Sequence, residues 1–274
     1  MSQPRPKAAA FFDLDKTILA TASSAALTRP FMRAGLANKR SVARSAYAQA
    51  AYQLGNSTAD QTDRLRTVLG EMVIGWESQL VVATTTAALD KVIAPQVFTG
   101  AAQLISHHRQ AGLDIVICTA AAKEVAEPIA TMLGAGHVLA TEMEADQGRF
   151  TGQIAYFNYG PAKAQAMSEL ALQQGYDLAA CYAYSDSITD LPMLRAVGHA
   201  VVVNPSKELR HIAEEAGWEV ARFSTPRPIQ RRRLRLGLVW AASLVATAVA
   251  AGAVTWILRR SPESNEVRPG PDLL

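Results

Sequence analysis

Near its start the chain reads Phe11-Phe12-Asp13-Leu14-Asp15-Lys16-Thr17-Ile18-Leu19. The apolar run 8–12 predicts a short buried strand. If the chain stays extended through Leu14, Asp13 and Asp15 project from one side of it and Leu14 packs on the other. A carboxylate pair at the carboxyl end of a parallel strand lies where open α/β sheets bind ligands. One carboxylate can then act as a nucleophile and the other as an acid or base, while an Asp-capped turn is the alternative interpretation.

Helical and strand patterns alternate after residue 98. The expected strands are 113–118, 137–141, 179–184 and 200–203, with a hairpin over 143–156, and the expected helices are 100–111, 119–132, 161–174 and 191–197. Residues 23–95 have helical spacing throughout and predict a helical insert after the first strand. Strands separated by helices predict an α/β fold with a parallel sheet that is covered on both faces.

Composition excludes several classes of function. The formal charge of +3 comes from a local cluster, Arg231, Arg232, Arg233 and Arg235, which argues against a nucleic-acid partner. Cys118 and Cys181 each lie in an apolar run, which predicts reduced cysteines in the core. The five histidines lack the spacing of zinc ligands, so no transition metal is expected.

The carboxyl-terminal part has a different character. Residues 224–236 predict a basic linker, and the uncharged residues 237–258 predict a transmembrane helix, with a buried globular helix as the alternative. At about 1.5 Å per residue this segment spans roughly 33 Å, enough to cross a bilayer core of about 30 Å. The arginines before it predict a single-pass cell-membrane protein with its large domain in the cytoplasm. The polar residues 259–274 predict a disordered tail.

Three further sites follow predicted strands or open predicted helices. The hydroxyl of Thr119, after the strand 113–118, can bind a phosphate oxygen or cap the next helix. Lys163 lies in the first turn of a predicted helix, where a cation is unfavourable unless it faces an anion. Asp186 can bind Mg²⁺, and Asp190 can orient a metal-bound water or Lys163. A solvated lysine and Asx-type capping are the alternatives.

Taken in order, these residues resemble the four motifs of the haloacid dehalogenase (HAD) superfamily over residues 8–220. The strings Phe-Phe-Asp-Leu-Asp-Lys-Thr and Tyr-Ser-Asp-Ser are similar to those of subfamily IB, which includes phosphoserine phosphatase. The resemblance implies a Rossmann-like core, here residues 1–22 and 96–223, and a helical cap, here residues 23–95.

The resemblance also implies roles for individual residues. Asp13 would attack phosphorus and become an aspartyl-phosphate, and Asp15 would protonate the leaving oxygen and then activate water. Mg²⁺ would be held by Asp13, Asp186 and the backbone carbonyl of Asp15. Thr119 and Lys163 would bind the transferred phosphoryl group.

Departures from the family concern the substrate. Phosphoserine phosphatases usually carry Glu where this chain has Ala22, Asn where it has Thr189, and a Gly-Gly pair after the hydroxyl residue, here Ala120 and Ala121. An arginine for a substrate carboxylate could be Arg64 or Arg66.

The function expected from the sequence is a membrane-tethered, Mg²⁺-dependent phosphomonoester hydrolase, similar to phosphoserine phosphatase, acting on a small phosphomonoester. A phosphatase or phosphotransferase acting on a lipid-linked or other small phosphate is one alternative. A membrane-anchored adaptor that has lost catalysis is the other.

Overall fold

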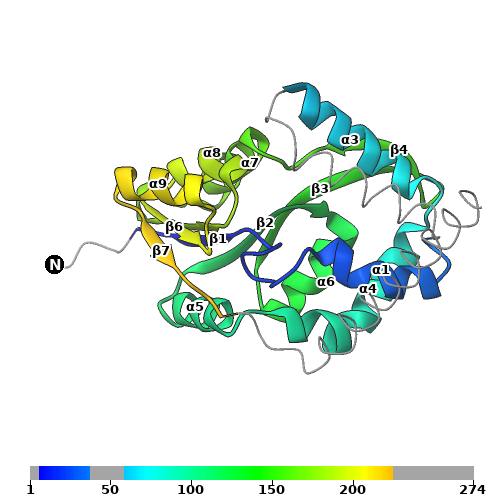
Figure 1. Ribbon diagram of the computed structural model, residues 1–274, viewed down its shortest axis with the longest axis horizontal. Coiled ribbons are helices and arrows are strands. Elements are labelled where there is room, and N and C mark those ends of the chain that lie inside the picture. Colours follow the sequence, from blue (N-terminus) through cyan, green and yellow to red (C-terminus); the bar gives the residue numbers. More distant parts are fainter. Residues whose placement is uncertain (1–5, 38–58, 225–274) are drawn as a thin grey trace, which may run out of the picture. The chain divides into compact units, whose positions relative to one another are not determined.

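The computed structural model describes residues 6–37 and 59–224. This part of the chain forms one seven-stranded sheet with the strand order β4-β3-β2-β1-β5-β6-β7 (Figure 1). The strands are β1 (Ala9–Phe12), β2 (Asp114–Ala122), β3 (His137–Asp146), β4 (Arg149–Tyr156), β5 (Tyr182–Ser185), β6 (His199–Val203) and β7 (Glu219–Ala221). Strand β1, which directly precedes Asp13 and Asp15, therefore lies in the middle of the sheet.

The sheet is mixed rather than parallel throughout. In the order of the sheet, all neighbouring strands from β3 to β7 are parallel, and only β3 and β4 pair antiparallel, as a hairpin. The predicted hairpin over 143–156 is confirmed, and its first arm continues the predicted strand 137–141, so that both form β3. The Rossmann-like α/β core is confirmed.

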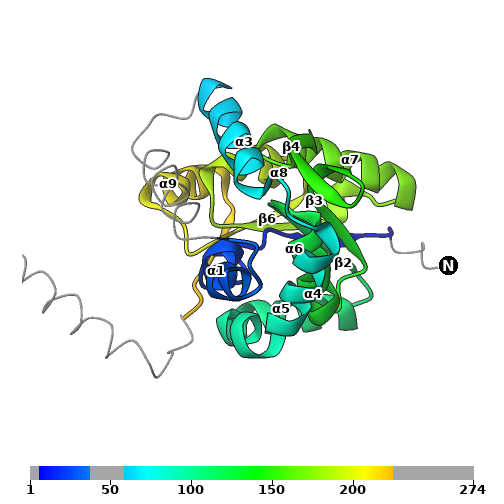
Figure 2. The same cartoon turned by 90° about the vertical axis from the view of Figure 1, so that its right-hand side faces the viewer.

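Helices cover both faces of the sheet (Figure 2). They are α1 (Ser23–Arg33), α3 (Ala59–Val73), α4 (Ser78–Ala88), α5 (Thr99–Gln110), α6 (Lys123–Leu133), α7 (Pro161–Gln174), α8 (Leu191–Arg195) and α9 (Lys207–Ala216). Phe12 belongs to the same core as Ile105 of α5 and Ile129 of α6. Its neighbour Phe11 belongs to a second core with Met167 of α7. Because side chains alternate along β1, its apolar run packs against both helix layers.

Two features of the core differ from the prediction. β2 continues to Ala122, so Thr119 lies within the strand and the next helix starts only at Lys123. The alanines after Thr119 favour helix, but the chain stays extended here between two pairs with β3, Cys118 with Leu139 and Ala122 with Thr141. Helix α9 and strand β7 were not predicted from the sequence. The two cysteines are buried and unpaired, as predicted.

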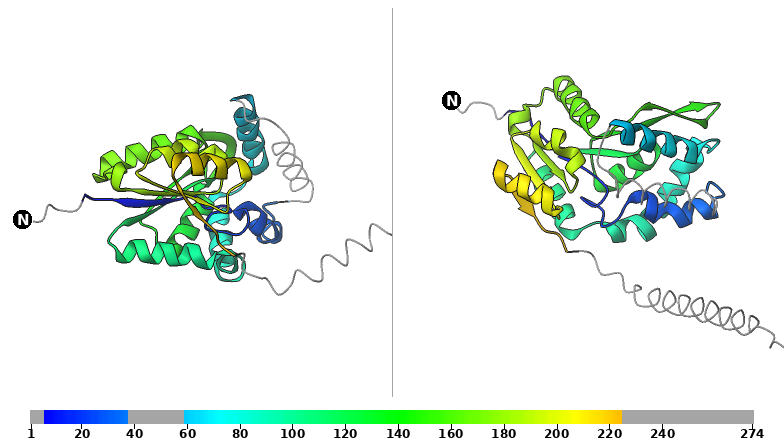
Figure 3. Two further views of the ribbon diagram at one scale, coloured as in Figure 1. Left: turned by 60° about the vertical axis from the view of Figure 1, so that its left-hand side comes forward. Right: turned by 45° about the horizontal axis from the view of Figure 1, so that its top comes forward.

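The helical insert docks on the hairpin. The backbone of Gly75 donates to Phe150 O at 2.8 Å, and Phe150 N donates to Trp76 O at 2.9 Å. Further along, Ser78 N donates to Gly148 O at 2.9 Å. Figures 1 and 3 show α3 lying beside this hairpin. The backbone between α3 and α4 therefore covers the outer edge of β4, while the predicted boundaries of a cap at 23–95 stay a prediction.

Close backbone contact makes Gly70 a sensitive position in this docking. A Cβ at Gly70 of α3 would lie 2.0 Å from the carbonyl oxygen of Gly152 in β4. Gly70→Ala is expected to lower the free energy of unfolding by about 1–3 kcal/mol, because helix and hairpin must move apart. Urea denaturation measures this. Gly136→Ala is the matched control, since a Cβ there has no atom within 4 Å; equal stability of the two variants would contradict the prediction.

The predicted transmembrane helix is corrected here. None of the helices within residues 6–37 and 59–224 combines the length and the apolar character that crossing a membrane requires. Even α3, with 15 residues, is shorter than the roughly 20 residues that span a bilayer core. The predicted linker 224–236 lies outside the described residues except for its first position, and the predicted segments 237–258 and 259–274 lie outside them entirely. The described residues therefore form an α/β sheet fold with an inserted group of helices.

The buried side chain of His108 makes the stability of the fold depend on pH. His108 of α5 is 5% exposed, and its Nε2 lies 2.6 Å from the hydroxyl oxygen of Tyr184 in β5. Burial and then the adjacent His107 lower the pKa of His108 to about 4. Other titratable groups near it are Tyr182 of β5 and Glu219 of β7, whose charge acts on Tyr184.

The stabilising effect of the neutral His108 is expected to disappear in acid. Because its folded pKa lies below the unfolded value, this contribution is complete above about pH 6.5 and falls as the pH drops toward 4. Between pH 7 and 5 the wild type should lose about 1–2 kcal/mol more unfolding free energy than His108→Gln. His211→Gln is the control, because its side chain is 72% exposed. Parallel pH profiles of wild type and His108→Gln would refute the assignment.

Candidate active site

A buried ion-pair cluster joins three of the residues predicted from the sequence. Asp13 directly follows β1, Lys163 lies in the first turn of α7, and Asp190 directly precedes α8. The ammonium of Lys163 lies 2.7 Å from Asp13 Oδ1 and 2.8 Å from Asp190 Oδ2. The three residues are 6%, 3% and 1% exposed in the order Asp13, Lys163, Asp190. Residues 150 positions apart in the sequence thus share one solvent-excluded site.

The charges in this cluster do not balance. Burial raises the pKa of Asp13 to about 7, the charges of Asp190 and Asp186 also raise it, and Lys163 opposes the change. Burial alone would lower the pKa of Lys163, but Asp13 and Asp190 together raise it above its ordinary value. Lys163 therefore stays protonated, and one cation serves several carboxylates.

Asp190 is fixed from a second side. The hydroxyl of Ser185, at the end of β5, donates to Asp190 Oδ2 at 2.7 Å. Of the two partners that the sequence analysis left open for Asp190, the structure gives it Lys163. Ser185 belongs to the predicted motif, but the sequence analysis assigned it no contact.

Asp15 is held apart from this cluster by the start of α1. The backbone N–H of Ser23 donates to Asp15 Oδ1 at 2.8 Å, and the hydroxyl of Ser23 donates to Oδ2 at 3.3 Å. Burial raises the pKa of Asp15 above its ordinary value, although the bonds from Ser23 act in the opposite direction. A carboxyl group with a raised pKa is suited to donate and accept a proton. Ser23 was missed, although a serine that opens a predicted helix is a recognisable signal.

Asp186 is tied to the first motif by Thr17. The Thr17 hydroxyl donates to Asp186 Oδ1 at 3.2 Å, and the backbone N–H of Asp186 donates to Thr17 Oγ1 at 3.0 Å. Burial raises the pKa of Asp186 to about 6, and Lys16 opposes the change. The carboxylate of Asp186 lies close enough to Asp13 to raise the pKa of Asp13. The loops after β1 and β5 therefore bring the two predicted metal ligands together.

The donor set fits Mg²⁺. The predicted ligands are the carboxylates of Asp13 and Asp186 and a backbone carbonyl, all of them hard oxygen donors. Within the described residues, no group of three or more His, Cys, Asp and Glu side chains is arranged to hold a metal ion. Mg²⁺ commonly takes one or two carboxylates and completes its shell with waters and substrate phosphate, so two carboxylates suffice for it. The excess negative charge described above also favours a cation.

Thr119 reaches the same end of the sheet. The register of β1 and β2 pairs Phe12 with Ile117, so Thr119 lies near the level at which Asp13 follows β1. Thr119 is 1% exposed, and its Oγ1 accepts a hydrogen bond from Ala121 N at 3.1 Å. Its carbonyl accepts a hydrogen bond from Asn158, a buried residue that the sequence analysis missed.

Of the two arginine candidates, Arg66 is not brought into this cluster. The guanidinium of Arg66 donates to the carbonyl of Ile154 in β4, as part of the docking of α3 on the hairpin. The side chain of Arg64 lies outside the described residues. Ala22 is the N-cap residue of α1, directly before the serine that holds Asp15.

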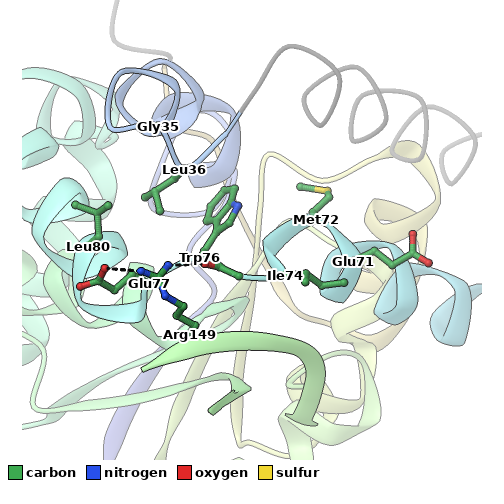
Figure 4. A pocket seen from close by; sticks show the side chains of 10 residues that line it. Gly35, Leu36, Glu71, Met72, Ile74, Trp76, Glu77, Leu80 and Arg149 are labelled. Atoms are coloured by element: carbon green, nitrogen blue, oxygen red, sulfur yellow. Dashed lines mark hydrogen bonds and ion pairs between the residues drawn. The ribbon is translucent and has the colours of Figure 1, made fainter. Parts of the chain in front are cut away.

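A separate hollow of about 520 Å³ lies between the helical insert and the tip of the hairpin (Figure 4). Trp76, Glu77 and Arg149 line it, and Arg149 binds both Glu77 and the carbonyl of Gly75. None of the residues of the ion-pair cluster lines this hollow. The chemistry predicted from the sequence therefore belongs to the end of the sheet, not to this hollow.

Known proteins resemble this chain in sequence and in fold. A protein named probable phosphatase from Mycobacterium tuberculosis is 46% identical over 260 residues, which cover 94% of this chain and 91% of the relative. A phosphoserine phosphatase of the same species is 35% identical, with 92% and 80% covered. A crystal structure of a protein of unknown function from Bordetella pertussis superposes with a TM-score of 0.69 at 30% identity, covering 79% of this chain and 98% of the other.

The family follows from the match of motifs, fold and sequence. The model of the haloacid dehalogenase-like hydrolases matches residues 10–195. That range contains the residues of the ion-pair cluster together with Asp15, Thr119 and Asp186. The chain belongs to the haloacid dehalogenase-like hydrolase family.

Proposed function

We propose that this protein is a Mg²⁺-dependent phosphomonoester hydrolase that forms an aspartyl-phosphate on Asp13. The observation that carries the proposal is the buried ion pair of Asp13 and Lys163, with Asp15 held separately by Ser23. Two carboxylates of one short loop thus have different partners, which suits one of them to attack and the other to transfer protons.

Asp13 is placed to attack phosphorus with one defined oxygen. Its Oδ1 is bound by Lys163, and its Oδ2 has no hydrogen bond within residues 6–37 and 59–224. A bond forms between Oδ2 and phosphorus while the bond from phosphorus to the leaving oxygen breaks. Asp15 gives its proton to that oxygen. Lys163 and Thr119 bind the phosphoryl oxygens, on which negative charge spreads in the transition state.

Hydrolysis of the intermediate uses the same two carboxylates. Asp15, now ionised, takes a proton from a water molecule as the water oxygen bonds to phosphorus. The bond between phosphorus and Asp13 breaks, and inorganic phosphate leaves. Asp13 and Asp186 would hold Mg²⁺, and the ion would supply positive charge that offsets the repulsion between the carboxylates and the phosphate.

The substrate is a small phosphomonoester. The names of the two mycobacterial relatives, a probable phosphatase and a phosphoserine phosphatase, support phosphate-ester hydrolysis. Ala22 lacks the carboxylate with which the phosphoserine enzymes would meet the substrate amine, so phosphoserine should have no advantage over other small phosphomonoesters.

Metal dependence tests the proposal. The purified full-length chain should release phosphate from a panel of small phosphomonoesters in the presence of Mg²⁺. Removing the metal with EDTA should lower the rate at least about 100-fold, because loss of several kcal/mol of charge stabilisation corresponds to such a factor. Adding Mg²⁺ back controls for damage by the chelator. Hydrolysis of no member of the panel, or an equal rate in EDTA, would refute the proposal.

A further inference from the structure

Strand β2 is irregular around Thr119, whose hydroxyl is the one proposed above to bind the phosphoryl group. Cys118 of β2 pairs with Leu139 of β3, but the next pair joins Ala122 to Thr141. Four steps along β2 thus correspond to two along β3, and the backbone around Thr119 leaves the regular ladder. Polar backbone groups buried in such a bulge need partners other than the neighbouring strand.

Two buried side chains supply these partners. Asn158 Nδ2 donates to the carbonyl oxygens of Thr119 at 3.0 Å and of Leu139 at 2.7 Å. The hydroxyl of Thr141 donates to Ala120 O at 2.8 Å. Thr141 Oγ1 in turn lies 3.3 Å from the backbone N–H of Asn158, which donates to it. Asn158 and Thr141 are 0% and 2% exposed, so water does not replace either of them.

One peptide unit connects Thr141 with the hydroxyl of Thr119. Ala120 O, which Thr141 binds, and Ala121 N, which donates to Thr119 Oγ1, belong to the same planar peptide group. Fixing the carbonyl end of this plane therefore fixes the direction of its N–H. Since Ala121 N donates to Thr119 Oγ1, the hydroxyl hydrogen of Thr119 remains free to be donated to a phosphoryl oxygen.

We propose that Thr141 and Asn158 are positioning residues that hold Thr119 in the orientation needed to bind the transferred phosphoryl group. Asn158 also lies in the short loop before α7, which carries Lys163, so the same pair ties the two phosphate-binding segments together. The inference rests on the proposed function, because it assigns Thr119 to the phosphoryl group.

A double-mutant cycle separates this role from a merely structural one. The full-length chain and its variants would be assayed for kcat and KM on p-nitrophenyl phosphate with Mg²⁺. Thr141→Val removes the hydroxyl and keeps the volume, and kcat/KM is expected to fall about tenfold. Thr141→Ser keeps the hydroxyl and should stay within about twofold of the wild type. In a Thr119→Ala background, Thr141→Val should change kcat/KM less than about twofold, because the group that it orients is already absent.

The chain offers a matched control. Thr85 of α4 is 0% exposed, and its hydroxyl has no hydrogen-bond partner within the described residues. Thr85→Val makes the same chemical change in the core outside the proposed site and should leave kcat/KM unchanged.

Each outcome decides the inference. A tenfold loss that is rescued by serine and vanishes in the Thr119→Ala background supports it. Normal activity of Thr141→Val, or an equal loss in both backgrounds, overturns it. If Thr141→Val does not fold, Thr141→Ala replaces it in the same cycle. Lack of activity in the wild type would instead overturn the proposed function, and the inference with it.

Discussion

Asp13→Asn is expected to lower kcat for p-nitrophenyl phosphate at least about 10³-fold while leaving the protein folded. Asparagine keeps the shape of aspartate but has no anionic oxygen with which to attack phosphorus. The residues of a catalytic site depend on one another, so removing the nucleophile also disables its partners. Only the rate enhancement from substrate binding then remains, which accounts for a loss of this size.

The free energy of unfolding of Asp13→Asn should not fall together with its activity. Lys163 retains Asp190 as a partner at 2.8 Å, so the loss of Asp13 leaves no unpaired buried cation. Because burial raises the pKa of Asp13, its ionisation opposes folding at neutral pH, and the asparagine variant should be at least as stable as the wild type. Urea denaturation at pH 7.5 checks this. Asp146→Asn, at the exposed tip of the hairpin, is the control that should leave activity unchanged. Activity of Asp13→Asn within tenfold of the wild type would disprove the nucleophile assignment.

Lys163→Met should abolish activity and also destabilise the fold. It removes the cation between two carboxylates, and breaking a buried ion pair from one side costs about 3–5 kcal/mol. The remaining carboxylates should regain part of this stability as the pH falls, because a carboxyl group with a raised pKa binds a proton more readily in the folded state.

The double variant Lys163→Met/Asp190→Asn tests the electrostatic origin of that loss. It should be more stable than Lys163→Met alone, because one of the two uncompensated charges is gone. Lys123→Met is the control, since its ion pair with Glu142 is exposed and should contribute less than about 1 kcal/mol. Equal losses at Lys163 and Lys123, or no recovery in the double variant, would show that the cluster is not held by charge.

The charged residues of the site were predictable from the sequence because they follow predicted strands or open predicted helices. Asp13 and Asp186 follow β1 and β5, which are adjacent in the sheet, and Lys163 opens α7. In a sheet of mostly parallel strands, the carboxyl ends meet at one edge, so position along the chain is enough to predict their meeting. Only the structure shows which oxygen of Asp13 is bound by Lys163, and that Asp190 is a partner of Lys163.

The supporting residues could not be predicted in the same way. Asn158 and Thr141 act through backbone carbonyls that become available only because β2 and β3 shift register, and nothing in the sequence 119–122 marks that shift. The alanines after Thr119 favour a helix, and this preference is overridden only by the tertiary pairs with β3 at Cys118 and at Ala122. Missing α9 has another reason, because its capping serine, Ser206, was visible in the sequence but was not used.

The most direct test of the account is to trap the phosphorylated protein. The wild type would be quenched in acid during turnover of p-nitrophenyl phosphate with Mg²⁺, and its peptides analysed by mass spectrometry. The account predicts one acid-stable, hydroxylamine-sensitive phosphoryl group on the peptide that contains Asp13, and none in Asp13→Asn. Turnover without any phosphorylated peptide, or a phosphoryl group on another residue, would contradict it.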